Sequence, residues 1–293
     1  MHLTSKRTIF RGYFWQRPRL WLILLVLLLL GLLAGGLVFR KLTAVRPGQS
    51  SVGLSPLTDL GSQTYRGMEG GLYPGGSNER PFAHEAAGVE IAKAIRPLAS
   101  DGSVDAEHGK IGFVAVGMSN TSLEFEAFLD QAAEIPQLNP AVRFVDGAQH
   151  SKASQFVANP DDAYWTVLGE RLADAGLSDA QVQIVWLKEA RAQTHLPLPL
   201  DALLLKADLR EIVELLYKRF PNLKIIYLSS RTYGGYATID LSPEPYAYQS
   251  AFAVKWLIED QLRGDVRLNY DPEKGTVYAP WLSWGPYLWA DGL

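Results

Sequence analysis

The stretch KIGFVAVGMSNTS at residues 110–122 decides the fold expected for this chain. Its first seven residues are mostly apolar and suit a buried strand, and the run breaks at Gly117 into small polar residues. An acidic segment with helical apolar spacing follows at 123–133. This order predicts a strand, a tight turn and a helix. Ser119 and Asn120 then lie at the carboxyl end of the strand, which is the edge that holds the ligand in open α/β sheets.

The polar residues of this turn also suit helix capping. Thr121 or Ser122 is expected to cap the helix, with the carboxylates of Glu124 and Glu126 near its positive end. Capping leaves the two polar residues that precede Thr121 unexplained.

Three further apolar segments alternate with helical patterns along the chain. The strands are expected at 110–116, 141–145, 182–187 and 224–228, and further helices at 84–96, 163–175, 200–220 and 246–262. Nearly continuous apolar strands indicate a parallel sheet covered on both faces, and right-handed crossovers bring the polar strand ends to one edge. The predicted fold class is therefore α/β, a three-layer, doubly wound and mainly parallel sheet. The helix at 84–96 is expected to pack near the first strand.

Composition limits the function. With 293 residues, 47% hydrophobic and 20% charged, the chain is long enough for one sizeable α/β domain plus appendages. The net charge of −3 gives no reason to expect nucleic acid as a partner. No cysteine is present, and no His, Asp and Glu residues have metal-ligand spacing, so neither a cofactor nor a metal is expected.

An uncharged run, LWLILLVLLLLGLLAGGLVF, fills residues 20–39. At about 1.5 Å per residue, a helix of this length crosses the roughly 30 Å hydrocarbon core of a membrane. Five basic residues precede the run and three follow it: Lys6, Arg7, Arg11, Arg17 and Arg19, then Arg40, Lys41 and Arg46. This excess predicts a single-pass cell-membrane protein with a cytoplasmic segment at 1–19 and an extracytoplasmic main part. A cleaved signal peptide is the alternative. A linker is expected at 40–80 and the α/β domain at 81–293.

Four blocks carry a family resemblance: GFVAVGMSN, RFVDGAQHSKAS, VQIVWLKEA and KIIYLSSRTYGGYA. In this order they resemble the SGNH, or GDSL-like, hydrolase superfamily, in particular a bacterial, membrane-anchored branch with a flavodoxin-like sheet. The resemblance implies that Ser119 is the nucleophile, although Met118 replaces the usual Asp before it. It also implies that the N–H groups of Gly147 and Ser119 form the oxyanion hole.

Two blocks of the superfamily are absent. The sequence WLKE stands at 186–189, where the superfamily has a motif that contains an Asn. No Asp-x-x-His motif follows before the loop-like end at 278–293. The resemblance therefore implies either a chain truncated at its C-terminus, whose missing tail holds the Asp and His, or a non-catalytic relative.

A serine hydroxyl needs a base within about 2.6–3.2 Å. Among the five histidines, His150 follows the second strand and is the candidate substitute base; a surface or hydrogen-bonded loop histidine is its alternative role. His195, after the third strand, lies at the same expected edge. Asn120 is expected either to donate to the oxyanion or to cap the helix.

Other residues of this edge are candidates for substrate binding. Lys188 and Glu189 end the third strand and either bind substrate or form a structural salt-bridge cluster, with each other or with Arg231. Aromatic side chains in the expected loops either bind a sugar or an acyl group or cover the core. These are Tyr233, Tyr236, Tyr246, Trp281, Trp284 and Trp289.

The sequence therefore predicts a membrane-anchored, extracytoplasmic SGNH-like serine esterase that acts on acyl esters of envelope carbohydrate. The alternative is a non-catalytic module of the same fold that binds polysaccharide or an envelope-assembly partner. Ser119 and Gly147 favour the esterase, and the absent Asn and His favour the binding module.

Overall fold

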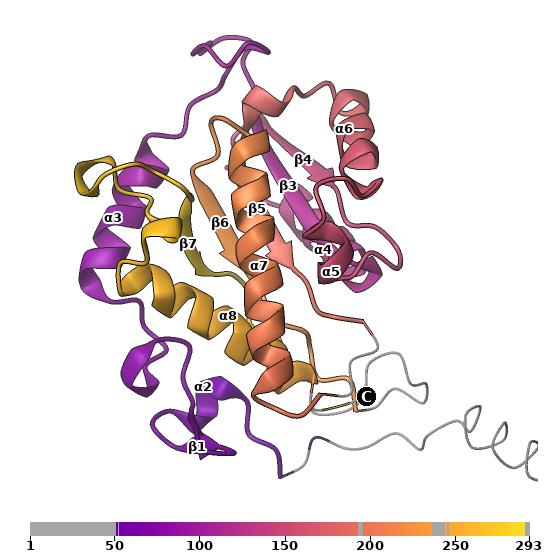
Figure 1. Cartoon of the computed structure of the whole chain (residues 1–293). Helices are drawn as coiled ribbons and strands as arrows, with labels where there is room; N and C mark the ends of the chain where they lie inside the picture. The colour runs from indigo at the N-terminus through magenta and orange to yellow at the C-terminus, as the bar shows by residue number, and fades with distance from the viewer. Residues whose placement is uncertain (1–50, 52, 193–195, 236–243, 245, 291–293) are drawn as a thin grey trace, which may run out of the picture. The chain divides into compact units, whose positions relative to one another are not determined.

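The computed structural model describes residues 51, 53–192, 196–235, 244 and 246–290 (Figure 1). The chain divides into two units, residues 1–46 and 47–293, and all described residues belong to the second. The predicted cytoplasmic segment and membrane-spanning helix at 1–39 thus lie outside the described residues. Within the described ranges, no helix has the length and the apolar character needed to cross a bilayer.

A five-stranded sheet with the strand order β4-β3-β5-β6-β7 forms the centre of this unit. All neighbouring strands are parallel. The strands are β3 (Ile111–Gly117), β4 (Val142–Asp146), β5 (Val182–Lys188), β6 (Ile225–Leu228) and β7 (Trp281–Trp284). The α/β class and the first four strands are confirmed. Because the chain first adds β4 on one side of β3 and then β5 on the other, the strand order reverses between β3 and β5, where open sheets of this kind bind ligands.

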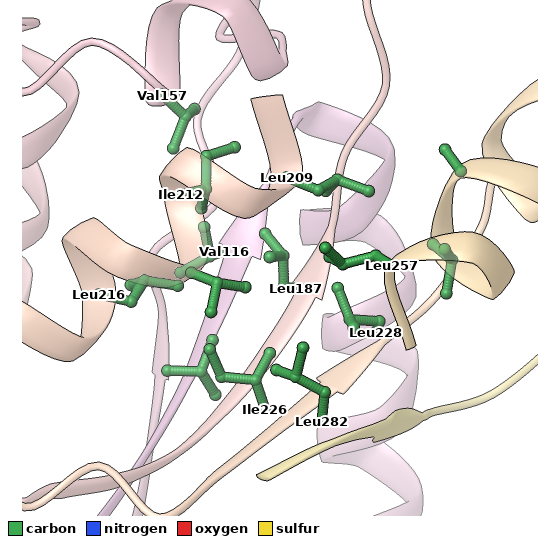
Figure 2. Close-up of a cluster of buried hydrophobic side chains, with 14 of the residues drawn as sticks. Val116, Val157, Leu187, Leu209, Ile212, Leu216, Ile226, Leu228, Leu257 and Leu282 are labelled. Carbon is green, nitrogen blue, oxygen red and sulfur yellow. The ribbon is translucent and has the colours of Figure 1, made fainter. Parts of the chain in front are cut away.

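Helices cover the two faces of the sheet unequally. The long helices are α3 (Phe82–Lys93), α4 (Ser119–Ala133), α6 (Tyr164–Asp174), α7 (Leu200–Arg219) and α8 (Tyr246–Leu262), with the short α5 at Ser154–Val157. We call the face under α6, α7 and α8 the packed face. Figure 2 shows the buried side chains of Leu187, Ile226 and Leu282 there, beside Leu209 of α7 and Leu257 of α8.

The opposite face, which we call the open face, carries a smaller cluster. Ala115 and Trp186 of the sheet pack there with Phe125 of α4, and Phe113 and Tyr227 lie partly buried beside them. Tilted ring contacts, with centroids 6.1 and 6.0 Å apart, join Phe125 to Phe113 and to Trp186.

Helix α4 begins four residues earlier than predicted. Met118, in an extended conformation, is the residue between β3 and the helix, and it makes no side-chain capping bond. The predicted capping by Thr121 or Ser122 is wrong, because both hydroxyls turn to neighbouring strand ends. Thr121 donates to the Lys188 carbonyl over 2.8 Å, and Ser122 donates to the Asp146 carboxylate.

The segment before α3 belongs to the folded unit. It holds α2 (Leu57–Leu60), a hairpin of β1 (Thr64–Tyr65) and β2 (Met68–Glu69), and a 3-10 turn at Pro74–Gly76. Leu57 and Tyr73 are buried in the main core, so residues before position 81 take part in it. The glycines permit close backbone approach: a Cβ on Gly71 would lie 2.3 Å from the carbonyl carbon of Gly76.

Helix α3 packs against β6 and β7 rather than near the first strand. A Cβ on Gly88 would lie 2.3 Å from the Trp281 ring, so the helix can approach the strand only with glycine there. The Trp281 indole N–H donates to the His84 carbonyl over 3.1 Å, and the His84 ring lies 2.8 Å from the Leu282 carbonyl oxygen. The prediction of loop structure at 278–287 is wrong for residues 281–284, which are the buried strand β7.

Candidate functional site

The polar ends of β3, β4, β5 and β6 lie at one edge of the sheet, as parallel strands require. Gly117, the last residue of β3, pairs in register with Lys188, the last residue of β5. The hydroxyl of Thr121 adds a bond between the first turn of α4 and the Lys188 carbonyl. A Cβ on Gly117 would lie 2.4 Å from the same carbonyl oxygen. The start of α4 is therefore held tightly against the end of β5.

Ser119 is the first residue of α4 and is half-buried. In the described ranges its hydroxyl makes no hydrogen bond to another residue, and the backbone N–H groups of Ser119 and Asn120 have no acceptor. The next two N–H groups of the turn, from Thr121 and Ser122, both donate to the Met118 carbonyl. A helix N-terminus with unpaired N–H groups favours negative charge. Ser119 thus shares one turn with two unused donors.

Gly147 follows β4 at the same edge, but its N–H is already used. It donates to the Ala115 carbonyl over 2.9 Å, so it is not a free oxyanion donor in this arrangement. Close packing explains the glycine instead, because a Cβ at this position would lie 2.6 Å from the Leu168 side chain of α6. Asn120, expected from the sequence either to donate to the oxyanion or to cap the helix, has an unused backbone N–H within the described ranges.

His150 lies in the loop after β4, and it is exposed. The preceding Gln149 fixes this loop: its N–H donates to the Gly117 carbonyl over 2.9 Å, and its side-chain amide donates to the Tyr164 carbonyl over 2.9 Å. His150 therefore directly follows a residue that is hydrogen-bonded to β3, the strand that precedes Ser119. No hydrogen bond orients its ring in the described part of the chain.

The other histidines are no better placed. His84 is buried under β7, where burial lowers its pKa. His108 is exposed in the loop before β3, at the opposite edge. His195 lies outside the described residues, and so does Tyr236.

Lys188 is 1% exposed and forms an ion pair with Glu124 of α4. Burial lowers the pKa of Lys188, and the Glu124 carboxylate opposes that shift. The Thr232 hydroxyl also donates to Glu124, over 3.3 Å. The predicted pairing of Lys188 with Glu189 is wrong, because the Lys188 ammonium pairs with Glu124 instead.

Glu189 directly follows β5 and is also 1% exposed. One carboxylate oxygen accepts the Ala190 N–H over 3.3 Å, and the other has no hydrogen-bond partner in the described structure. Burial raises the pKa of Glu189 well above its usual range; the Ala190 N–H and the charge of Arg231 act against the rise, and Asp208 adds to it. The carboxyl group is therefore held in its neutral form more strongly than a surface Glu.

Arg231, after β6, is half-buried at this edge, and its backbone N–H donates to the Ser250 hydroxyl over 3.0 Å. Burial lowers the pKa of its guanidinium, and Glu244 is the largest of the charges that oppose the shift. Of the predicted substrate-binding residues within the described ranges, Arg231 is the one with appreciable exposure.

The predicted aromatic residues serve mainly in packing. Tyr233 is buried and stacks on Trp289, with ring centroids 5.2 Å apart. Tyr246 is buried at the start of α8, and Trp281 and Trp284 are buried in β7. Within the described ranges these rings serve mainly in packing, and Trp284 also lines the groove described next.

A groove of about 540 Å³ opens on the open face, between α4 and the segment after β7. Its walls are largely aromatic, and among the described residues Glu124 is the one charged residue that lines it. The main lining residues are Phe113, Phe125, Phe128, Trp186, Tyr227 and Trp284. Its volume lies in the range of small-molecule sites. Sequence reasoning missed the groove, since its aromatic residues come from segments far apart in the chain.

Comparisons with known proteins add little. No family model and no curated protein matches the chain. Among solved structures, the chain is similar to the periplasmic domain of a lipopolysaccharide acetyltransferase from Salmonella ser. Paratyphi A, with a TM-score of 0.31 and 13% sequence identity. The match covers 71% of this chain and 77% of the other. A likeness at this level supports no statement about family or activity.

Proposed function

We propose that this protein is a serine-dependent ester hydrolase, with Ser119 as the nucleophile. One observation carries the proposal: an unengaged serine hydroxyl lies at the first turn of α4, at the carboxyl end of a central strand, with two unused N–H groups in that turn. Attack on an ester creates an oxyanion, and N–H groups at a helix N-terminus stabilise such a charge.

The proposed steps use residues of this edge. The Ser119 hydroxyl attacks the ester carbonyl carbon while a base takes its proton, and the N–H groups of Ser119 and Asn120 donate to the oxyanion. The proton passes to the leaving alcohol as the ester bond breaks. A water molecule, deprotonated by the same base, then attacks the acyl-serine. The bond between the acyl carbon and the Ser119 oxygen breaks, the acid leaves, and the base returns its proton to the Ser119 oxygen. His150 is the proposed base, and Arg231 is the proposed contact for a polar part of the substrate.

The substrate class is an acyl ester of envelope carbohydrate. This part of the proposal is supported by the sequence resemblance to SGNH hydrolases and by the expected extracytoplasmic location of the domain.

A non-catalytic binding module is the second candidate. It is favoured by the His150 ring, which no carboxylate orients in the described part of the chain, since a base without an orienting partner is a poor general base. The burial of Tyr233, Trp281 and Trp284 weakens the version in which these rings bind polysaccharide.

A fluorophosphonate probe on the full-length chain tests the proposal. We expect labelling of the wild type, loss of the label in Ser119→Ala, and retention in Ser122→Ala, a serine of the same turn whose hydroxyl is bound to Asp146. His150→Gln should lower the rate of labelling by about 10²–10⁴ if it is the base. An unlabelled wild type, or label that persists in Ser119→Ala, rejects the hydrolase and favours the binding module.

A further inference from the structure

Four leucines are exposed together at the start of α7 and just before it. Leu196, Leu200, Leu203 and Leu204 are 42%, 52%, 44% and 42% exposed. Residues three and four apart lie on one side of a helix, so the three leucines of α7 form an outward stripe while Leu205 and Leu209 face the core. We call these four residues the leucine patch. Contiguous exposed apolar groups of this kind mark interaction surfaces.

The leucine patch lies where the chain enters the folded unit. Tyr248 and Gln249, consecutive residues of α8, bridge the two segments. The Tyr248 hydroxyl donates to the Ser55 carbonyl over 2.8 Å, and the Gln249 amide donates to the Leu196 carbonyl over 3.1 Å. Figure 1 shows α2, β1 and the first turns of α7 at the same end of the unit. Leu54, next to Ser55, adds another exposed apolar side chain.

This end is also the edge that carries Ser119. The chain leaves the carboxyl end of β5 at Lys188 and enters α7 at Leu200, so the first turn of α7 lies at the carboxyl edge of the sheet. The leucine patch and the candidate site therefore share one edge.

The leucine patch itself carries almost no exposed charge, while Asp59 of α2 and Glu69 of β2 are exposed at the same end of the unit. Asp201 is the one acidic residue in the segment 196–205, and it is 3% exposed. Arg66 is exposed at the tip of the β1–β2 hairpin, above Tyr65, which in turn stacks on Tyr248 with centroids 3.7 Å apart. Apolar side chains with a cation at their rim are typical of surfaces that lie in a membrane interface.

We propose that the leucine patch rests on the surface of the lipid bilayer. Eleven residues, 40–50, lie between the apolar run at 20–39 and Ser51. Such a stretch reaches about 40 Å at most when fully extended, so a membrane-embedded run keeps this end of the domain close to the bilayer. If the protein is the proposed esterase, its substrates are esters presented at the membrane surface. This second inference rests on the proposed function.

The absence of cysteine permits a direct test. The full-length chain carrying Leu203→Cys is labelled with an NBD fluorophore and reconstituted in vesicles of phosphatidylcholine and phosphatidylglycerol that contain nitroxide-labelled lipid. The control is Val266→Cys, 69% exposed in the turn after α8. We expect the lipid nitroxide to quench the probe at 203 about twofold or more relative to the probe at 266. In a Leu200→Cys probe variant, adding Leu203→Asp and Leu204→Asp should reduce the quenching.

Equal quenching at both positions overturns the proposal. A blue shift at 203 that depends on protein concentration and not on the lipid quencher also overturns it, and assigns the patch to a second copy of this chain. Fluorophosphonate labelling of the same variants reports on Ser119 separately, so failure of membrane contact is distinguishable from failure of the hydrolase proposal.

Discussion

The two faces of the sheet differ in how completely they are closed. On the packed face, Val116, Leu187 and Ile226 are fully buried beneath α7 and α8. On the open face, Phe113 and Tyr227 are only partly buried, and the aromatic groove remains between α4 and the segment after β7. The packed face therefore holds most of the stability, while the open face has room for a ligand and borders the Lys188–Glu124 pair.

Truncating one side chain on each face should reveal the greatest difference in the free energy of unfolding between the two faces. Leu209→Ala removes a 1% exposed side chain from the packed face and should lower the free energy of unfolding by about 2–5 kcal/mol. Phe128→Ala, on the wall of the groove and 38% exposed, should cost about 1 kcal/mol. Urea unfolding of the two variants measures the difference. Equal losses would show that the open face is as tightly packed as the other.

The ion pair at the rim of the groove gives the next effect. Glu124→Gln leaves the buried Lys188 ammonium without its partner and should lower the free energy of unfolding by about 3 kcal/mol. Glu126→Gln, exposed on the same helix, is the control and should change it by less than about 0.5 kcal/mol. If both variants unfold alike, the pair does not hold α4 to the sheet.

The buried Glu189 should make the free energy of unfolding depend on pH, with a smaller effect than the variants above. Its folded pKa is raised above the unfolded value of about 4.3, so above that pH the folded chain binds more protons than the unfolded chain. The stability due to this group is therefore complete below about pH 4.3. It is lost as the pH rises toward the folded pKa, by up to about 1.4 kcal/mol per pH unit.

Glu189→Gln should flatten this part of the stability profile. Urea unfolding between pH 5 and 8 measures the slope, with Glu170→Gln, an exposed residue of α6, as the control. Parallel profiles for wild type and Glu189→Gln would mean that the buried carboxyl does not titrate differently in the folded chain.

Much of the sheet was predictable because its strands are apolar runs bounded by strong stop signals. Gly176, for example, ends α6 with a φ of +67°, a conformation that favours glycine. The sequence does not predict strand β7, because the short segment WLSW lies between a proline and a glycine. Its residues also lack the alternation of polar and apolar side chains that is typical of a strand. The burial of all four of its residues comes from tertiary contacts with α3 and α8.

The candidate site was predictable in its location but not in its bonds. Parallel topology alone brings Ser119, Gly147 and Lys188 to one edge. Local sequence does not reveal that Lys188 pairs with Glu124, 64 residues away, or that the Gly147 N–H is used by the sheet. Both outcomes depend on which face each strand residue takes and on how α4 lies across the strand ends.

The segment that holds α2 and α3 packs against β7 and the residues after it, and this arrangement affects the order in which the unit folds. The bonds between Trp281 and His84 and between Leu57 and Tyr287 join positions 197 and 230 residues apart. Contacts of such long sequence separation form late, since the loop entropy must be lost before they contribute. During synthesis, α2 and α3 are made well before β7, which begins 188 residues after the end of α3 and 221 after the end of α2. The first helices of this unit to be made are therefore among the last to dock, and until then their apolar sides are targets for chaperones and proteases.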